Sequence, residues 1–127
     1  DRSDGIDVLA KVGGFDLGGM AGVFLGGAAK KIPVIIDGFI SAAAALLAVT
    51  ICPEAKAYMI ASHLSKEPAM QMILEALEKK PLLTCDMCLG EGTGAVAIFP
   101  LLQMAEDVYK KMSTFGEISI ESYKELK

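Results

Sequence analysis

The residues best suited to chemistry lie in one glycine-rich segment, Leu89-Gly90-Glu91-Gly92-Thr93-Gly94. Glycines let the backbone approach a ligand closely, and the N-terminus of a helix that follows them favours an anion. The segment lacks the Gly-Lys-Ser/Thr ending of a P-loop. It also departs from the dinucleotide-binding G-x-G-x-x-G pattern, because Ala95 stands at the third glycine. Glu91 could act as a general base, or it could cap the next helix through a favourable dipole interaction.

Two cysteines precede this segment with the spacing Cys85-x-x-Cys88, which suits a redox pair or half of a zinc site. A zinc site needs about four ligands, and the other soft candidates, Cys52 and His63, are unevenly spaced. A redox pair is expected at the start of a helix that directly follows a strand, whereas a glycine-rich turn intervenes here. We therefore interpret Cys85 and Cys88 as ordinary thiols and expect no metal site.

Two further polar residues each follow a short apolar run that is typical of a buried strand. His63, between Ser62 and Ser65, could bind a phosphate or a polar substrate, or it could be structural. Asp37 could bind a ribose, orient a loop or cap the helix that begins near Phe39. The residue types alone leave these alternatives open.

Alternating helices and short apolar strands must position these residues. We expect helices over 7–12, 16–29, 40–51 and 67–79, and a long helix from the glycine turn to about Met112. Strands are expected over 32–36 and 57–61, with a third strand or extended segment at 81–83. This order predicts an α/β fold with a partial doubly wound, Rossmann-like parallel sheet flanked by helices. So thin a sheet looks like part of a larger one, completed by missing residues or another chain.

In such sheets ligands bind beyond the carboxyl ends of the strands. That rule predicts that the loops at 37–38, 62–65 and 89–94 form one binding region.

Composition narrows the class of protein. The chain has 127 residues, of which 53% are hydrophobic and 22% charged, so one folded domain is expected and a disordered chain is excluded. A net charge of −4 argues against nucleic-acid binding. The apolar stretch over 39–52 would cover about 21 Å as a helix, short of the roughly 30 Å of a bilayer core. Free cysteines and no visible signal peptide favour the cytoplasm.

Several segments, taken together and in order, resemble one enzyme family. They are Val12-Gly13-Gly14-Phe15-Asp16-Leu17, Met20-Ala21-Gly22, Pro33-Val34-Ile35-Ile36-Asp37-Gly38-Phe39-Ile40-Ser41, Ala61-Ser62-His63-Leu64-Ser65 and Leu89-Gly90-Glu91-Gly92-Thr93-Gly94-Ala95. The chain is similar, to about Phe115, to the C-terminal part of the nicotinate-nucleotide–dimethylbenzimidazole phosphoribosyltransferases.

The resemblance implies a cytoplasmic, homodimeric enzyme of cobalamin lower-ligand assembly. Such an enzyme moves phosphoribose from nicotinate mononucleotide to 5,6-dimethylbenzimidazole and yields α-ribazole 5′-phosphate and nicotinate, without a metal or other cofactor. The family's catalytic glutamate falls on Glu91. Leu89 and Gly90 would lie beside the bases, and Gly38 and Ser65 near the ribose phosphate.

The resemblance also implies that residues 1–127 are the C-terminal portion of a longer α/β domain. The mixed sequence of the tail, at about 113–127, predicts a further short helix. The family's glycine-rich phosphate segment and a lysine would lie in the missing N-terminal part, so this chain alone is expected to hold half a site and to be inactive. Cys88 occupies a position that the family usually fills with a basic residue. The alternative is a non-catalytic nucleotide-binding or partner domain of the same fold.

Overall fold

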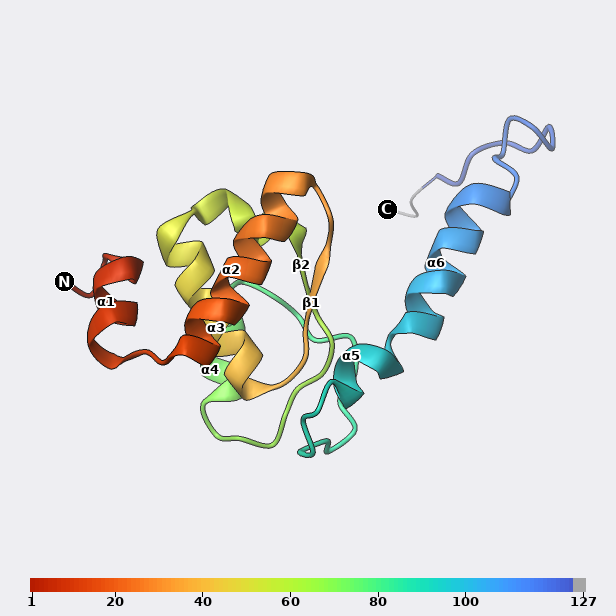
Figure 1. Ribbon diagram of the computed structural model, residues 1–127. Helices are drawn as coiled ribbons and strands as arrows, with labels where there is room; N and C mark the ends of the chain where they lie inside the picture. Colours follow the sequence, from red (N-terminus) through yellow and green to blue (C-terminus); the bar gives the residue numbers. More distant parts are fainter. Residues whose placement is uncertain (125–127) are drawn as a thin grey trace.

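A pair of short parallel strands, bordered by helices, forms the centre of the protein in the computed structural model, which describes residues 1–124 (Figure 1). The elements follow one another as α1 (Gly5–Val12), α2 (Phe15–Lys30), β1 (Val34–Ile36), α3 (Phe39–Ile51), the 3-10 helix η1 (Pro53–Tyr58), β2 (Met59–Ala61), α4 (Met70–Ala76), α5 (Thr93–Ala97) and α6 (Phe99–Lys111). The predicted α/β class with a small parallel sheet is therefore confirmed.

The sheet is extended on one side by the expected segment at 81–83. β1 and β2 pair in parallel with Ile36 opposite Ala61, and the pairing continues as the Ser62 amide donates to the Ile36 carbonyl over 3.0 Å. Beyond β2, a single parallel bridge joins His63 to Leu83. Pro81, at the start of this segment, has no amide proton for a ladder, so the segment is extended without being a full strand.

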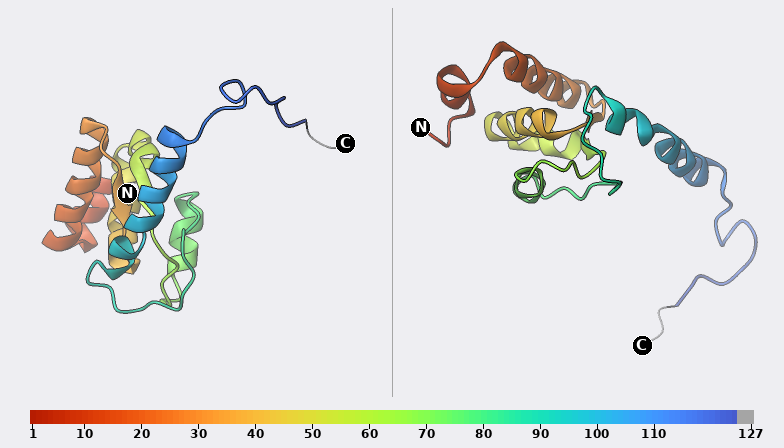
Figure 2. Two further views of the ribbon diagram at one scale, coloured as in Figure 1. Left: turned by 90° about the vertical axis from the view of Figure 1, so that its right-hand side faces the viewer. Right: turned by 90° about the horizontal axis from the view of Figure 1, so that it is seen from below.

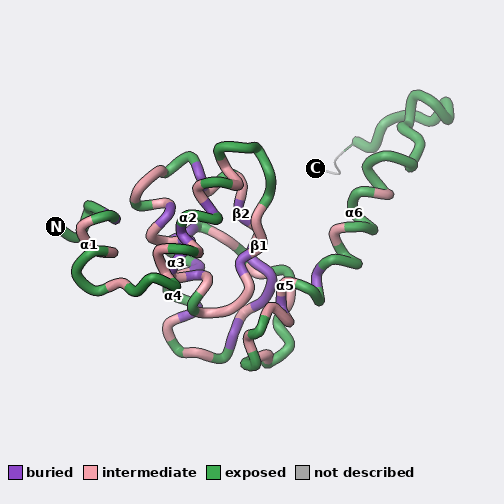
Figure 3. The backbone as a smooth tube through the Cα atoms, viewed as in Figure 1, coloured by how far each residue is buried: buried purple, intermediate pink, exposed green. Residues whose placement is uncertain are grey.

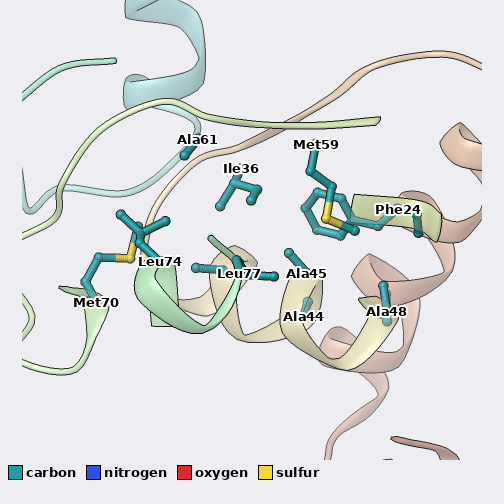
Figure 4. Close-up of a cluster of buried hydrophobic side chains, with 13 residues drawn as sticks. Phe24, Ile36, Ala44, Ala45, Ala48, Met59, Ala61, Met70, Leu74 and Leu77 are labelled. Atoms are coloured by element: carbon teal, nitrogen blue, oxygen red, sulfur yellow. The ribbon is translucent and has the colours of Figure 1, made fainter. Parts of the chain in front are cut away.

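Helix α3 lies at the centre of the core. It contacts α1, α2, α4, η1 and β1. One side of α3 carries small side chains that are wholly buried, namely Ala42, Ala44, Ala45 and Ala48. Figure 4 shows Ile36 of β1 and Met59 of β2 directed toward these alanines, with Phe24 of α2 beside Met59. The small side chains let the sheet and the neighbouring helices approach the α3 backbone closely.

Three expected elements are shorter than the sequence suggests. β1 covers only Val34–Ile36 of the predicted 32–36. Residues 57 and 58 end the 3-10 helix instead of starting β2, and α4 covers only Met70–Ala76 of the predicted 67–79. The predicted long helix is divided into α5 and α6 at Ile98. Pro100 explains the division, because it has no amide proton to donate to the carbonyl four residues earlier.

The C-terminal part of the described chain projects from the body. Figures 1 and 2 show α6 leading away from the sheet, and Figure 3 shows that most of α6 is exposed. Residues 113–124 form turns instead of the predicted helical tail, and residues 125–127 of that prediction lie outside the described residues. Thr114 begins the turn by donating its amide to the Glu117 carboxylate over 2.7 Å.

Within residues 1–124, every helix is too short or too polar to span a bilayer.

Truncating Leu74 tests the role of α4 in this core. Leu74 is 2% exposed, whereas Met72, two residues away on the same helix, is 69% exposed. We expect Leu74→Ala to lower the free energy of unfolding by about 2–5 kcal/mol, because it leaves a cavity. Met72→Ala should change it by less than about 0.5 kcal/mol. Urea denaturation of the two variants measures both values, and equal effects would contradict the assigned core.

Candidate active site

Three loops meet in one hollow at the carboxyl ends of the strands. The hollow has a volume of about 190 Å³. It is lined by Asp37, Gly38, Phe39, Ile40, Ser65, Glu67, Cys88, Leu89, Gly90 and Glu91. The structure therefore brings together the five site residues that the family resemblance assigned: Gly38, Ser65, Leu89, Gly90 and Glu91.

Asp37, at the end of β1, joins the sheet to the glycine turn. Its Oδ2 accepts a hydrogen bond from the Gly92 amide at 3.0 Å, and its Oδ1 accepts one from the Ala95 amide at 2.9 Å. These amides belong to the start of α5, where no intrahelical acceptor is available. Of the three roles left open for Asp37, the structure thus shows loop orientation.

The conformation of the turn places Glu91 at the hollow. Gly90, Glu91 and Gly92 all have positive φ angles, of 72°, 56° and 77°. Two of these positions suit glycine, and Glu91 adopts a region that side chains other than glycine rarely occupy. The Glu91 side chain is exposed and lines the hollow. Asp37 accepts the Gly92 and Ala95 amides, and among the hydrogen bonds of residues 1–124 none joins an α5 amide to the Glu91 carboxylate, which therefore stays open to the hollow.

His63 lies behind the turn and not in the hollow. It is 1% exposed, and its Nδ1 is 3.0 Å from the Ser62 Oγ. The Ser62 hydroxyl donates its one proton to the Asp37 carbonyl at 2.9 Å, so Nδ1 must be the donor to Ser62. A Cβ on Gly94 would lie only 1.9 Å from His63 Nδ1. Of the alternatives for His63, the structure therefore supports the structural one.

Glu67 is a lining residue that the sequence analysis missed. Its carboxylate accepts a hydrogen bond from the Ser65 hydroxyl. That hydrogen bond, with help from the Glu67 backbone amide and from His63, lowers the pKa of Glu67. The available signal was its position two residues after Ser65, in the same strand-exit loop.

The hollow is acidic. Three carboxylates line it, from Asp37, Glu67 and Glu91, and no Lys, Arg or His does so among the described residues. Cys88 lines it as a free thiol, and Cys85 is also free. Within residues 1–124 no group of His, Cys, Asp or Glu side chains is arranged to hold a metal ion. This half of the site therefore suits positive or neutral ligand groups better than a phosphate.

Gly94→Ala tests the close contact behind the turn. The added Cβ would lie 1.9 Å from His63 Nδ1 and 2.9 Å from Asp37 Oδ1, so the turn must move. We expect a loss of at least about 1–3 kcal/mol in the free energy of unfolding. Gly22→Ala in α2 is the matched control, because nothing lies within 4 Å of its Cβ position. That variant should be neutral or more stable by up to about 1 kcal/mol in the same thermal or urea measurement, and similar losses in both would contradict the packing.

Ser65→Ala tests the interaction between Ser65 and Glu67. Removing the hydroxyl should raise the pKa of Glu67 toward its ordinary value, because this hydrogen bond is the main cause of the lowering. With a lowered pKa in the folded state, the bond stabilises the loop at neutral pH, and the effect is lost as the pH falls through that pKa. Titration of the carboxyl ¹³C signal measures it. Ser113→Ala should leave the signal unchanged, and an unchanged pKa in Ser65→Ala would refute the assignment.

Known proteins share this sequence and geometry. The family model DBI_PRT, described as phosphoribosyltransferase, matches residues 1–120. The nicotinate-nucleotide–dimethylbenzimidazole phosphoribosyltransferase of Ruminiclostridium cellulolyticum is 53% identical over 124 residues, covering 98% of this chain and 35% of the relative. The enzyme of the same name from Clostridium acetobutylicum is 53% identical over 127 residues, covering 100% of this chain and 36% of the relative.

A solved structure agrees with these relatives. The crystal structure of the corresponding phosphoribosyltransferase from Thermus thermophilus superposes with a TM-score of 0.87 at 42% identity, over 94% of this chain and 36% of that one. The chain thus spans about a third of the length of the proteins that it matches. With a family match over residues 1–120 and a shared fold over 94% of its length, the chain belongs to the DBI_PRT phosphoribosyltransferase family.

Proposed function

We propose that this chain is the C-terminal third of a nicotinate-nucleotide–dimethylbenzimidazole phosphoribosyltransferase. The whole enzyme would transfer phosphoribose from nicotinate mononucleotide to 5,6-dimethylbenzimidazole, giving α-ribazole 5′-phosphate and nicotinate for cobalamin lower-ligand assembly. The observation that carries the proposal is the placement of Glu91. Its carboxylate lines the hollow, at the tip of a glycine turn. The helix that follows this turn is capped by Asp37.

Glu91 is the general base of the proposed reaction. One benzimidazole nitrogen attacks the anomeric carbon of the ribose while Glu91 takes the proton from the other nitrogen. The new bond from nitrogen to carbon forms as the bond to the pyridinium nitrogen breaks, and that electron pair stays on the departing nicotinate. Attack opposite the leaving group inverts the anomeric configuration. A base is needed because alkylation would otherwise leave the benzimidazole positively charged.

The acidic lining of the hollow suits the positively charged groups of this reaction. The pyridinium of the donor nucleotide and the positive charge that develops at the anomeric carbon are favoured near Glu67 and Glu91. Leu89, which is 73% exposed, offers an apolar surface beside the base, next to Gly90. Gly38 and Ser65 carry no positive charge for the phosphate, and the Ser65 hydroxyl already donates its proton to Glu67. The remaining two thirds of the protein must therefore supply a cation for it, and the chain alone should be inactive.

Exposed apolar side chains on α6 indicate the protein partners. Apolar side chains of α6 are exposed, among them Phe99, Met104 and Val108. We propose that the missing N-terminal part of the protein and a second copy in a cytoplasmic homodimer complete the fold. No metal, other cofactor, nucleic acid or membrane has a part in the proposal. Cys88, at a position that the family usually fills with a basic residue, would alter the preference for the base or the rate.

Glu91→Gln tests the proposed base. The assay protein, called the fusion below, joins this chain to the N-terminal two thirds of the Clostridium acetobutylicum relative, and nicotinate release is followed by chromatography. We expect kcat to fall about 10²- to 10⁴-fold, with KM nearly unchanged because the amide keeps the size of the carboxyl group. Glu121→Gln, in the exposed tail, is the matched control and should keep full activity.

Each outcome separates the candidate functions. Base-dependent nicotinate release that survives Glu91→Gln would support the transferase and refute the role of Glu91. No release with any benzimidazole or purine base would contradict the transferase. It would favour the alternative, a non-catalytic nucleotide-binding or partner domain of the same fold.

A further inference from the structure

The position of Glu91 depends on a turn that has few contacts of its own. Gly90, Glu91 and Gly92 all have positive φ, and Glu91 is exposed, so its side chain does not anchor the backbone. Within the turn, Thr93 bonds only to the Gly90 carbonyl, through its amide at 3.0 Å and its hydroxyl at 2.6 Å. These local bonds shape the turn without fixing its place above the sheet.

Asp37 supplies the missing attachment. Among residues 1–124, its bonds to the amides of Gly92 and Ala95 are the hydrogen bonds that tie segment 89–97 to the strand ends. One of these amides directly follows Glu91, and the other lies within the first turn of α5. The attachment spans 55 residues of sequence to Gly92 and 58 to Ala95.

Asp37 is itself held on both sides. Its amide donates to the Ser41 Oγ at 2.9 Å, and its carbonyl accepts the Ser62 hydroxyl at 2.9 Å. Gly94 lies directly against it, since a Cβ there would be 2.9 Å from the Asp37 Oδ1. A carboxylate held in this way fixes the position of the turn relative to β1.

We infer that Asp37 is the positioning residue of Glu91, acting through the Gly92 and Ala95 amides and not through contact with the substrate. This inference rests on the proposed function of the site. Both carboxylate oxygens are needed, because each accepts one amide. An error of about 1 Å in the position of a catalytic group can lower a rate about 10²-fold, so the link matters for the chemical step.

Asp37→Asn in the fusion is the first test. Its amide group keeps one acceptor oxygen and replaces the other with a donor, so one backbone amide loses its partner. We expect kcat to fall about 10- to 100-fold while KM for the nucleotide stays within about twofold. Asp37→Glu, which keeps both oxygens, should recover part of kcat. Asp16→Asn in α2, outside the hollow, is the matched control and should leave kcat unchanged.

A double-mutant cycle separates positioning from a general structural effect. If Asp37 acts only through Glu91, Asp37→Asn should cause no further loss of kcat in a fusion that already carries Glu91→Gln. Losses that multiply would overturn the inference, because Asp37 would then act independently of Glu91. A large rise in KM for the nucleotide would also overturn it and point to ribose binding by Asp37.

Hydrogen exchange on the unaltered fusion keeps the inference testable if Asp37→Asn does not fold. The amides of Gly92 and Ala95 should be protected relative to those of Gly90 and Glu91. Rapid exchange of both amides in an active fusion would overturn the role of Asp37 and leave the proposed function standing. A folded fusion without transferase activity would overturn the proposed function. The hydrogen bonds from Asp37 to the turn would then have no role in catalysis.

Discussion

The site depends on one carboxylate that accepts two backbone hydrogen bonds across the fold. Asp37 ends β1, and through the amides of Gly92 and Ala95 it holds a turn more than 50 residues further along the chain. The amides at the start of a helix have no partner within the helix and favour an anion. The Asp37 carboxylate therefore both caps α5 and positions the turn. These hydrogen bonds, together with the close packing of Gly94 on His63, place the glycine-rich turn above the sheet.

The core and the end of β2 hold the backbone of Asp37 in place. The alanine side of α3 lets the sheet pack closely on this helix, and Ile36, the residue before Asp37, is wholly buried there. Ser62 then fixes the Asp37 carbonyl from the end of β2. The chain thus supports the turn that carries Glu91 through Asp37. It does not build a phosphate site, because no cation lines the hollow among the described residues. This division agrees with a chain that spans about a third of its relatives.

Local patterns predicted much of this arrangement. Apolar runs and glycine breaks located the helices and the two strands, and the rule that ligands bind at the carboxyl ends of parallel strands brought the right loops together. The role of Asp37 stayed open because its partners lie far away in sequence. Glu67 was missed because its involvement depends on the path of the loop after Ser65. The division at Ile98 was missed because helical periodicity was followed through Pro100, which cannot donate an amide hydrogen bond. The turns after Met112 were missed because periodicity does not show where a helix lacks neighbours to pack against.

The most direct measurement is a crystal structure of the fusion with 5,6-dimethylbenzimidazole bound. We predict that the ring lies in the hollow beside Leu89 and Gly90. One ring nitrogen should lie within hydrogen-bonding distance of the Glu91 carboxylate, and both bonds from Asp37 to the turn should be intact. A base bound elsewhere, or bound in the hollow with Glu91 directed away from both ring nitrogens, would contradict it.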